Sequence, residues 1–288
     1  MIALQGIDWD LEGRAVMALA ERVAAHGHPM EHVLAPAGNR GVPAGDLDGD
    51  GRTGRAADMH GWATFRGQGA MAVLSRYPLS LEADLSALLW RDLPGASRTG
   101  ADGSDLLAGA HEGLRLSTTS HWAVRIDAPE GPVTLLTHHA TPPVFDGPED
   151  RNGRRAADEL AVWAVFLDGA LADVPGGAAV PDSPVVLAFA ANVDPLDGDG
   201  PGEAVRAFLA HPGIRDPEPR GGGASEPDEA HRGDPALDTV RWEGVGNLRV
   251  DYVLAGPGTR PVAAGMDWPL RDAHSRHAVV WADIEIAR

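Results

Sequence analysis

The sequence predicts an α/β protein built from packed β-sheets. Short apolar runs of strand length recur along the whole chain, and segments with apolar residues at helical spacing fall between them. Polar stretches rich in Gly and Pro separate these elements, as is typical of surface loops. Because the expected strands outnumber the helices while helices still fall between them, packed α/β layers are favoured over a pure β-sandwich.

The composition limits the classes of function. A chain of 288 residues can bury a large core, and we expect residues 1–288 to form a single domain. Its net charge of −18, from 42 acidic and 24 basic residues, repels nucleic-acid phosphates, so a nucleic-acid partner is disfavoured. The absence of cysteine excludes disulfides, zinc–thiolate sites and cysteine nucleophiles.

The chain shows no pattern of a membrane or export segment. No apolar run approaches the roughly 18 residues of a membrane span. The first ten residues, MIALQGIDWD, lack the charged start and long apolar core of a signal peptide. They are typical of a β-strand that begins at residue 2. We therefore expect a soluble chain, whose compartment stays open. A monomer is the expected oligomeric state.

The expected strands are apolar or alternating runs that polar turns bound. One of them, the run VVLA, ends before an acidic, Gly-rich turn, as buried strands that lead into active-site loops do. In chain order the expected strands are residues 2–4, 32–36, 70–74, 114–126, 133–137, 185–188, 249–254 and 278–286, with a further short element at 85–90.

Three helices are expected from the spacing of apolar residues above a polar face, at residues 12–25, 154–171 and 202–210. The helix at 154–171 is the clearest, with Leu160, Val162 and Trp163 on its inner side. Polar or Gly-rich stretches predict surface loops at 38–61, 94–112 and 217–234.

The first of these loops contains alternating aspartates, Asp46, Asp48 and Asp50, followed by Gly51. This pattern is similar to the first half of a calcium loop, in which alternate positions of a tight turn bring their oxygens together. The twelfth position is Ala57 rather than Glu, and no helical pattern flanks the loop. Two interpretations stay open: a Ca²⁺ site, and a solvated turn that its own Asp side chains cap.

Polar residues stand at the ends of five expected strands, which suggests one shared site at a rim of packed sheets. Asp251 lies between apolar strand residues and needs a partner if it is buried. His277 is the natural partner, because an Asp–His pair orients an imidazole as a general base. A structural interpretation also stays open, because a histidine after a strand is often a residue at the edge of the sheet whose hydrogen bonds are already made. The polar residues at the five strand ends are residues 5–8, residues 138–139, Asn192 with Asp194, Asp251, and residues 275–277.

Several sequence motifs along the chain resemble those of the endonuclease/exonuclease/phosphatase superfamily, the group of deoxyribonuclease I and the sphingomyelinases. The resemblance is strongest to a bacterial branch of this superfamily. The motifs are DLDGDG, GQGAMAVLS, THHATPPVFDGPEDRNGRR, ANVDPLDGDG, RGDPALDT and GNLRVDYVL, in the expected order over nearly the whole chain. The resemblance implies a four-layer fold of two packed mixed β-sheets flanked by helices. It also implies that Mg²⁺ or Mn²⁺ and a His–Asp pair hydrolyse a phosphoester by in-line attack of water.

Four residues match catalytic positions of the superfamily that the chain resembles. His139 matches the histidine that contacts the scissile phosphate, and Asn192 matches the asparagine of the Gly-Asp-x-Asn motif. Asp251 matches the aspartate that orients the terminal histidine, here His277. We add two candidate substrate-binding residues, Arg276 and His121.

The expected metal site departs from the family pattern. Gly6 replaces a metal-binding Glu, and Arg276 replaces the aspartate of a Ser-Asp-His ending. Phe189 and Ala190 stand where Gly-Asp is expected, and the family's first strand is absent. Asp8 and Asp194 are the remaining candidate metal ligands.

These departures leave three functions open. The first is a metal-dependent phosphoesterase with reduced activity, since each lost metal ligand removes transition-state stabilisation. The second is an inactive relative that binds a phosphorylated ligand through Arg276, His139 and His277. The third is an acidic calcium-binding module.

Overall fold

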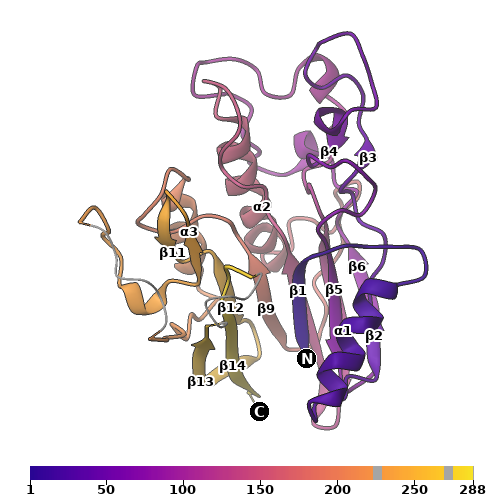
Figure 1. Ribbon diagram of the computed structural model, residues 1–288, viewed down its shortest axis with the longest axis vertical. Helices are drawn as coiled ribbons and strands as arrows, with labels where there is room; N and C mark the ends of the chain where they lie inside the picture. The colour runs from indigo at the N-terminus through magenta and orange to yellow at the C-terminus, as the bar shows by residue number, and fades with distance from the viewer. Residues whose placement is uncertain (223–228, 269–274, 288) are drawn as a thin grey trace.

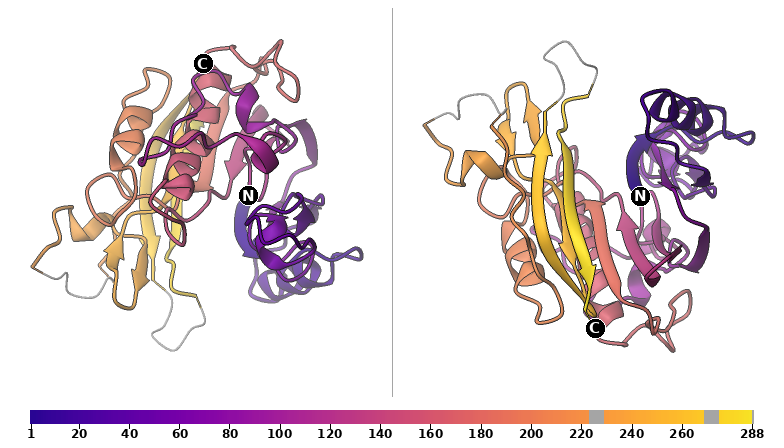
Figure 2. Two further views of the ribbon diagram at one scale, coloured as in Figure 1. Left: turned by 90° about the horizontal axis from the view of Figure 1, so that it is seen from above. Right: turned by 90° about the horizontal axis from the view of Figure 1, so that it is seen from below.

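The computed structural model describes residues 1–222, 229–268 and 275–287, and it has the predicted α/β architecture (Figure 1). A three-stranded sheet and a five-stranded sheet pack face to face, with helices on their outer sides. Figure 2 shows the indigo β1 and the yellow C-terminal hairpin on the same side of the five-stranded sheet. In the part of the chain that is described, no helix is long and apolar enough to cross a membrane.

The three-stranded sheet is antiparallel and has the order β1-β5-β2. Its strands are β1 (Ile2–Ile7), β5 (Ala70–Ser75) and β2 (His32–Leu34). Helix α1 (Arg14–Ala25) covers its outer face and buries Val16 and Ala20 against β5. The helical spacing of apolar residues in the sequence predicted this face.

The five-stranded sheet is mixed and has the order β12-β9-β8-β7-β6. Only β8 and β9 run parallel, and helix α2 (Arg151–Leu167) makes the crossover that parallel neighbours require. Helix α3 (Gly202–Leu209) lies beside α2 on the same outer face. The strands are β12 (Asp251–Ala255), β9 (Val185–Ala190), β8 (Gly131–His138), β7 (His121–Ala128) and β6 (Leu79–Asp84).

Smaller elements surround these two sheets. A C-terminal hairpin joins β13 (Thr259–Asp267) and β14 (Val279–Ile286), and β14 packs near β12. Two short ribbons pair β10 (Val240–Trp242) with β11 (Gly246–Leu248) and β3 (Val42–Pro43) with β4 (Met59–His60). Single 3₁₀ turns lie at η1 (Ala56–Asp58), η2 (Trp90–Asp92), η3 (Gly109–His111) and η4 (Pro235–Leu237).

The core has two main layers. Between the sheets, Met71 and Val73 of β5 pack against Trp122, Val124 and other residues of the five-stranded sheet. Outside that sheet, Trp163 and Phe166 of α2 belong to a larger cluster that Leu136 and Leu187 also join. This alternation places one face of each central strand in each layer, which is why those strands read as continuous apolar runs.

The expected start of the strand at 114–126 was wrong. Residues 114–120 are irregular, and strand β7 begins only at His121. Their backbone pairs in part with the turn at 88–90, where Leu116 N donates to Leu88 O, and in part with side chains: Thr118 N donates to Glu159 Oε1. The short element expected at 85–90 is a turn that leads into η2.

Strands β6 and β13 were not expected from the sequence. β6 is an edge strand and four of its six residues are exposed, so its apolar pattern is interrupted. β13 contains Pro261 at a position where its register with β14 shifts, and proline within a run argues against a strand.

Candidate functional site

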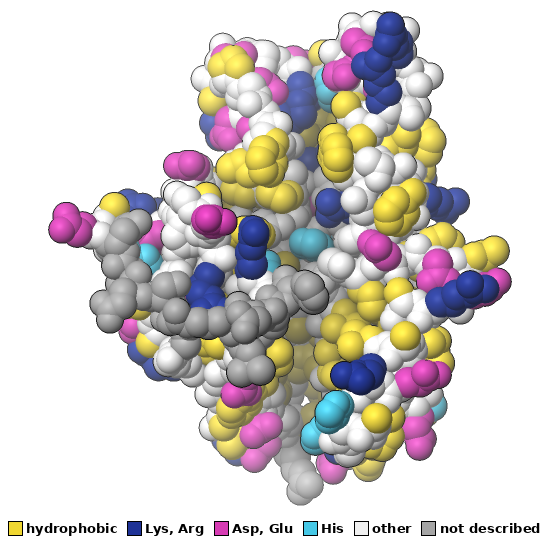
Figure 3. Space-filling model, viewed as in Figure 1, with side chains coloured by type: hydrophobic (Ala, Val, Ile, Leu, Met, Phe, Trp, Pro, Cys, Tyr) yellow, Lys and Arg dark blue, Asp and Glu magenta, His cyan; other side chains and the backbone are white. Residues whose placement is uncertain are grey.

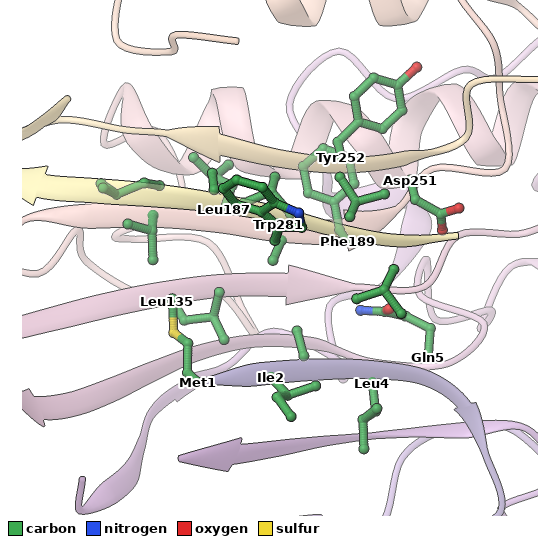
Figure 4. A pocket seen from close by; sticks show the side chains of 18 of the residues that line it. Met1, Ile2, Leu4, Gln5, Leu135, Leu187, Phe189, Asp251, Tyr252 and Trp281 are labelled. Atoms are coloured by element: carbon green, nitrogen blue, oxygen red, sulfur yellow. The ribbon is translucent and has the colours of Figure 1, made fainter. Parts of the chain in front are cut away.

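A cavity of about 820 Å³ opens between β1 and β14, with the five-stranded sheet as its floor. Figure 3 shows the same face of the molecule hollowed along its middle, with hydrophobic and histidine side chains inside the hollow. In Figure 4, Gln5 from β1 and Asp251 from β12 lie toward one end of the cavity, and Met1 and Leu135 lie toward the other. The polar lining residues include Gln5, His139, Asp251, Ser275 and His277.

Asp251 and His277 form the expected pair. Asp251 begins β12, where it is opposite Ala190 in the register with β9, and its N–H donates to Thr239 Oγ1 at 3.0 Å. His277 Nδ1 donates to Asp251 Oδ2 at 2.7 Å. Burial favours the neutral imidazole, but the hydrogen bond and charge of Asp251 outweigh it, so the pKa of His277 is raised above its usual value.

His139 follows β8 and lies in the same cavity. It forms an isolated parallel bridge with Ala190, which pairs on its other side with Asp251, so Ala190 of β9 lies between His139 and Asp251 in the sheet. Burial, followed by the charges of Arg40 and His277, lowers the pKa of His139 to about 3. His139 is therefore neutral at pH 7, and no described residue hydrogen-bonds to its buried Nδ1.

Asn192 supports this region without lining the cavity. It adopts a positive φ of 55°, a conformation in which Asn is enriched, and its Nδ2 donates to Ala140 O at 2.6 Å. This hydrogen bond ties the turn after β9 to the residue that follows His139. Asn192, expected as a catalytic residue, thus lies in the turn behind the cavity and not in its lining.

The two candidate substrate-binding residues lie outside the cavity lining. His121 is 1% exposed, donates from Nε2 to Glu159 O at 2.8 Å, and stacks on His138 in the core. Arg276 is exposed and its guanidinium lies over the ring of Trp242. His121 therefore lies in the core, whereas Arg276 lies beside the pair, because the Trp242 ring also meets the His277 ring edge-on at 5.6 Å.

The residues at the expected metal positions do not fit a divalent ion. Gly6 has a φ of +80° at a register shift in β1, and Ala190 is buried without a polar group. Asp194 accepts three backbone N–H bonds, from Leu196, Asp197 and Arg249. Asp8 accepts from Gly69 N and does not line the cavity. We therefore assign no chemical step to a metal at this site.

Within the described ranges, the group that could hold a metal ion is Asp46, Asp48 and Asp50, whose oxygens lie within 4.8 Å of one another. Their carboxylates also bind within their own loop: Asp46 accepts from Gly51 N, and Asp50 forms an ion pair with Arg55 at 2.5 Å. The loop thus shows both features expected from the sequence, converging oxygens and self-capped turns.

Phe189 has a structural role where the family motif has glycine. It is 3% exposed, and its ring stacks on His138 at 4.5 Å and on Tyr252 at 5.6 Å. The aromatic ring therefore fills the outer core layer beneath the site.

Sequence reasoning missed Arg40, which lies close to the site. Its Nε is buried with no hydrogen-bond partner among the described residues, and its charge contributes to the low pKa of His139. The guanidinium packs beside Gly69, where a Cβ would lie in ordinary contact with its carbon at 3.6 Å. No periodic signal marks Arg40, because it stands in a loop far from the other site residues in the chain.

No protein-family model and no curated protein sequence matches the chain. Three solved structures with similar folds cover 99% of it. An endonuclease/exonuclease/phosphatase from Beutenbergia cavernae has a TM-score of 0.57 at 19% identity, with 62% of that chain covered. A family protein from Leptotrichia buccalis has 0.51 at 14% identity, with 87% covered. Sphingomyelinase C from Streptomyces griseocarneus has 0.52 at 16% identity, with 85% covered.

The chain thus spans 62% of the length of the first of these structures. The matched elements include both packed sheets and the helices outside them, since the similarity runs along nearly all of the described chain. The protein therefore has the fold of the endonuclease/exonuclease/phosphatase proteins.

Proposed function

We propose that the protein hydrolyses a small phosphoester, with water activated by the Asp251–His277 pair. The observation that carries this proposal is the 2.7 Å contact between His277 Nδ1 and Asp251 Oδ2 at the polar end of the cavity. Because Nδ1 donates to the carboxylate, Nε2 is the atom that takes a proton from water. The water oxygen then bonds to phosphorus, and the bond to the leaving oxygen breaks.

His139 supports this reaction by contacting the phosphate. A neutral imidazole donates one N–H to a phosphate oxygen without placing a second positive charge in a buried site. Arg40 supplies positive charge nearby, which favours an anionic ligand. The net charge of −18 disfavours a long nucleic acid as the substrate.

Hydrolysis of bis(p-nitrophenyl) phosphate tests this proposal. We expect His277→Ala to lower turnover by about 100-fold or more, since general bases contribute that much. The matched control is His26→Ala, which removes an exposed histidine at the end of α1. Equal turnover in the two variants would contradict the proposal, and assays with Mg²⁺, Mn²⁺ or EDTA show whether a metal contributes.

A second candidate is a phosphate-binding protein without turnover. The observation that favours it is the absence of carboxylates at Gly6 and Ala190, where the family resemblance expects metal ligands. It predicts that calorimetry detects binding of p-nitrophenyl phosphate, that His139→Ala weakens this binding, and that no product forms. Product formation above that of His277→Ala excludes this second function.

A further inference from the structure

Arg40 carries a charge for which the described residues provide no ion pair. Its Nε is buried, and no described residue accepts a hydrogen bond from it. Asp8 and Glu159 lie near enough for their charges to act on Arg40, yet in the described part of the chain neither forms an ion pair with it. A partly buried guanidinium without a carboxylate partner is unfavourable, which indicates that a ligand completes this place.

The two nearby carboxylates are engaged elsewhere. Asp8 Oδ1 accepts a backbone N–H at 2.7 Å. Glu159 is fully buried, and its two oxygens accept from the backbone of Thr118 and Thr141. Burial raises the pKa of Glu159, which weakens this carboxyl further as a counter-charge. The positive charge of Arg40 is therefore available to an anion.

The backbone next to Arg40 is held in place by buried hydrogen bonds. Asn39 is 1% exposed, and its Nδ2 donates to Ser86 O at 2.6 Å and to Ser117 O at 2.7 Å. The backbone N–H of Asn39 also donates to Thr119 O at 2.8 Å. A cation whose backbone is fixed before a ligand arrives needs little reorganisation on binding, and such preorganisation makes charged groups effective at reaction sites.

The same loop lies beside His139. Gly38 packs directly on Ser120, where a Cβ of residue 38 would lie 2.4 Å from the Ser120 Oγ. The register of β7 with β8 places the residues that precede β7 beside those that follow β8, so Ser120 and His139 are neighbours. The charge of Arg40 accordingly contributes to the low pKa of His139. Each of these two groups has a buried nitrogen without a hydrogen-bond partner among the described residues, Arg40 Nε and His139 Nδ1.

The ligand that fits these groups is a phosphoryl group. A guanidinium and a neutral imidazole both donate hydrogen bonds, so the ligand has to supply acceptor oxygens and negative charge. A phosphoryl group has enough oxygens for one to accept from Arg40 and another from His139, and a guanidinium matches the geometry of phosphate. The metal positions Gly6 and Ala190 carry no carboxylate that would bring a divalent cation to this ligand.

We propose that Arg40 is a phosphate-binding residue, which holds a phosphoryl oxygen beside His139 and supplies the positive charge that Gly6 and Ala190 do not recruit as a metal ion. The phosphoryl group is that of the proposed substrate, so this inference rests on the proposed function. As water attacks, negative charge is spread over the phosphoryl oxygens, and the guanidinium stabilises it. Phosphate binding is measured without turnover, so the two proposals fail separately.

Calorimetry with inorganic phosphate, in buffer that contains EDTA, tests this inference. We expect the parent chain to bind phosphate. Arg40→Met removes the charge and should weaken binding at least about tenfold, because a hydrogen bond to a charged group contributes that much. Arg40→Lys keeps the charge but not the forked geometry, and should fall between the two. The matched control is Arg66→Met, which removes an exposed arginine from the same connection between β2 and β5 and should bind as the parent does.

A second pair of variants leaves Arg40 unchanged. A Cβ at Gly69 would lie 3.6–3.8 Å from three atoms of the guanidinium, and its φ of +60° is one at which Asn and Asp are enriched. Gly69→Asp places a carboxylate beside Arg40, and should weaken phosphate binding at least about tenfold relative to Gly69→Asn, which has the same shape without the charge. This comparison decides the question if Arg40→Met does not fold.

The outcomes separate the two proposals. Phosphate binding that Arg40→Met or Gly69→Asp does not weaken, or that the parent chain shows only with added Mg²⁺, overturns the role of Arg40 and leaves the Asp251–His277 pair as proposed. Weakened phosphate binding in both variants, together with equal turnover of His277→Ala and its control, supports the role of Arg40 and contradicts the proposed hydrolysis.

Discussion

The hydrogen bond between His277 and Asp251 controls the pH at which the proposed base loses its proton. Because the pKa of His277 is raised, the neutral imidazole forms only when the pH exceeds the ordinary pKa of histidine. Turnover should therefore increase as the pH rises through the raised pKa of His277. Asp251→Asn removes the carboxylate charge, which should lower this pKa and move the rising limb to lower pH. A pH–rate profile measures the shift, and an unchanged limb assigns the base to another residue.

The same pair predicts a stability difference with a defined sign. A histidine whose pKa is raised by folding contributes stability that is complete below its unfolded pKa and is lost as the pH rises through its folded pKa. Asp251→Asn should therefore cost most stability at mildly acidic pH, and the difference from the parent chain should shrink at alkaline pH. Urea unfolding at several pH values measures this difference.

Buried His121 predicts the opposite pH dependence. Burial lowers its pKa to about 4, so its contribution is complete above its usual pKa and is lost as the pH falls toward 4. In His121→Gln the side chain cannot take up a proton. The parent chain should lose stability relative to this variant between about pH 6.5 and 4. A constant difference in urea midpoint over this range contradicts the prediction.

At the residue scale, the sequence predicted those contacts that follow from local chemistry. An aspartate inside an apolar strand needs a partner, and this argument found the Asp251–His277 pair. The direction in which a strand histidine points depends on the sheet that forms around it. The sequence alone therefore did not show that His121 turns into the core while His139 turns toward the cavity.

At the scale of elements, apolar runs were reliable where both faces of a strand are covered. Strands β5 and β9 were predicted because α1, α2 and the opposing sheet bury them from both sides. Edge strands lack that double burial, so β6 and β13 carry no continuous apolar signal. Irregular buried segments such as 114–120 resemble strands in sequence because their residues also pack in the core.

The packing of Phe189 on β9 predicts a large cost for its removal. Phe189→Ala deletes a ring that contacts His138, Tyr252 and Phe208, and should lower the free energy of unfolding by about 3–5 kcal/mol. Val279→Ala on β14 removes a side chain that is 66% exposed, and should change it by less than about 0.5 kcal/mol. Urea denaturation compares the two, and equal costs would contradict the packing role of Phe189.

At the scale of the whole molecule, the shared core between the sheets predicts one unfolding unit for residues 1–288. Met71 and Val73 of the three-stranded sheet pack against Trp122 and Val124 of the five-stranded sheet, so neither sheet keeps its core without the other. Tryptophan fluorescence and far-UV circular dichroism should therefore report the same thermal midpoint. Two separate midpoints would show that the sheets unfold independently, as two domains would. Met71→Ala weakens the contact between the sheets, so it should lower the thermal midpoints from both signals by the same amount. If the sheets unfolded independently, only one of the two midpoints would shift.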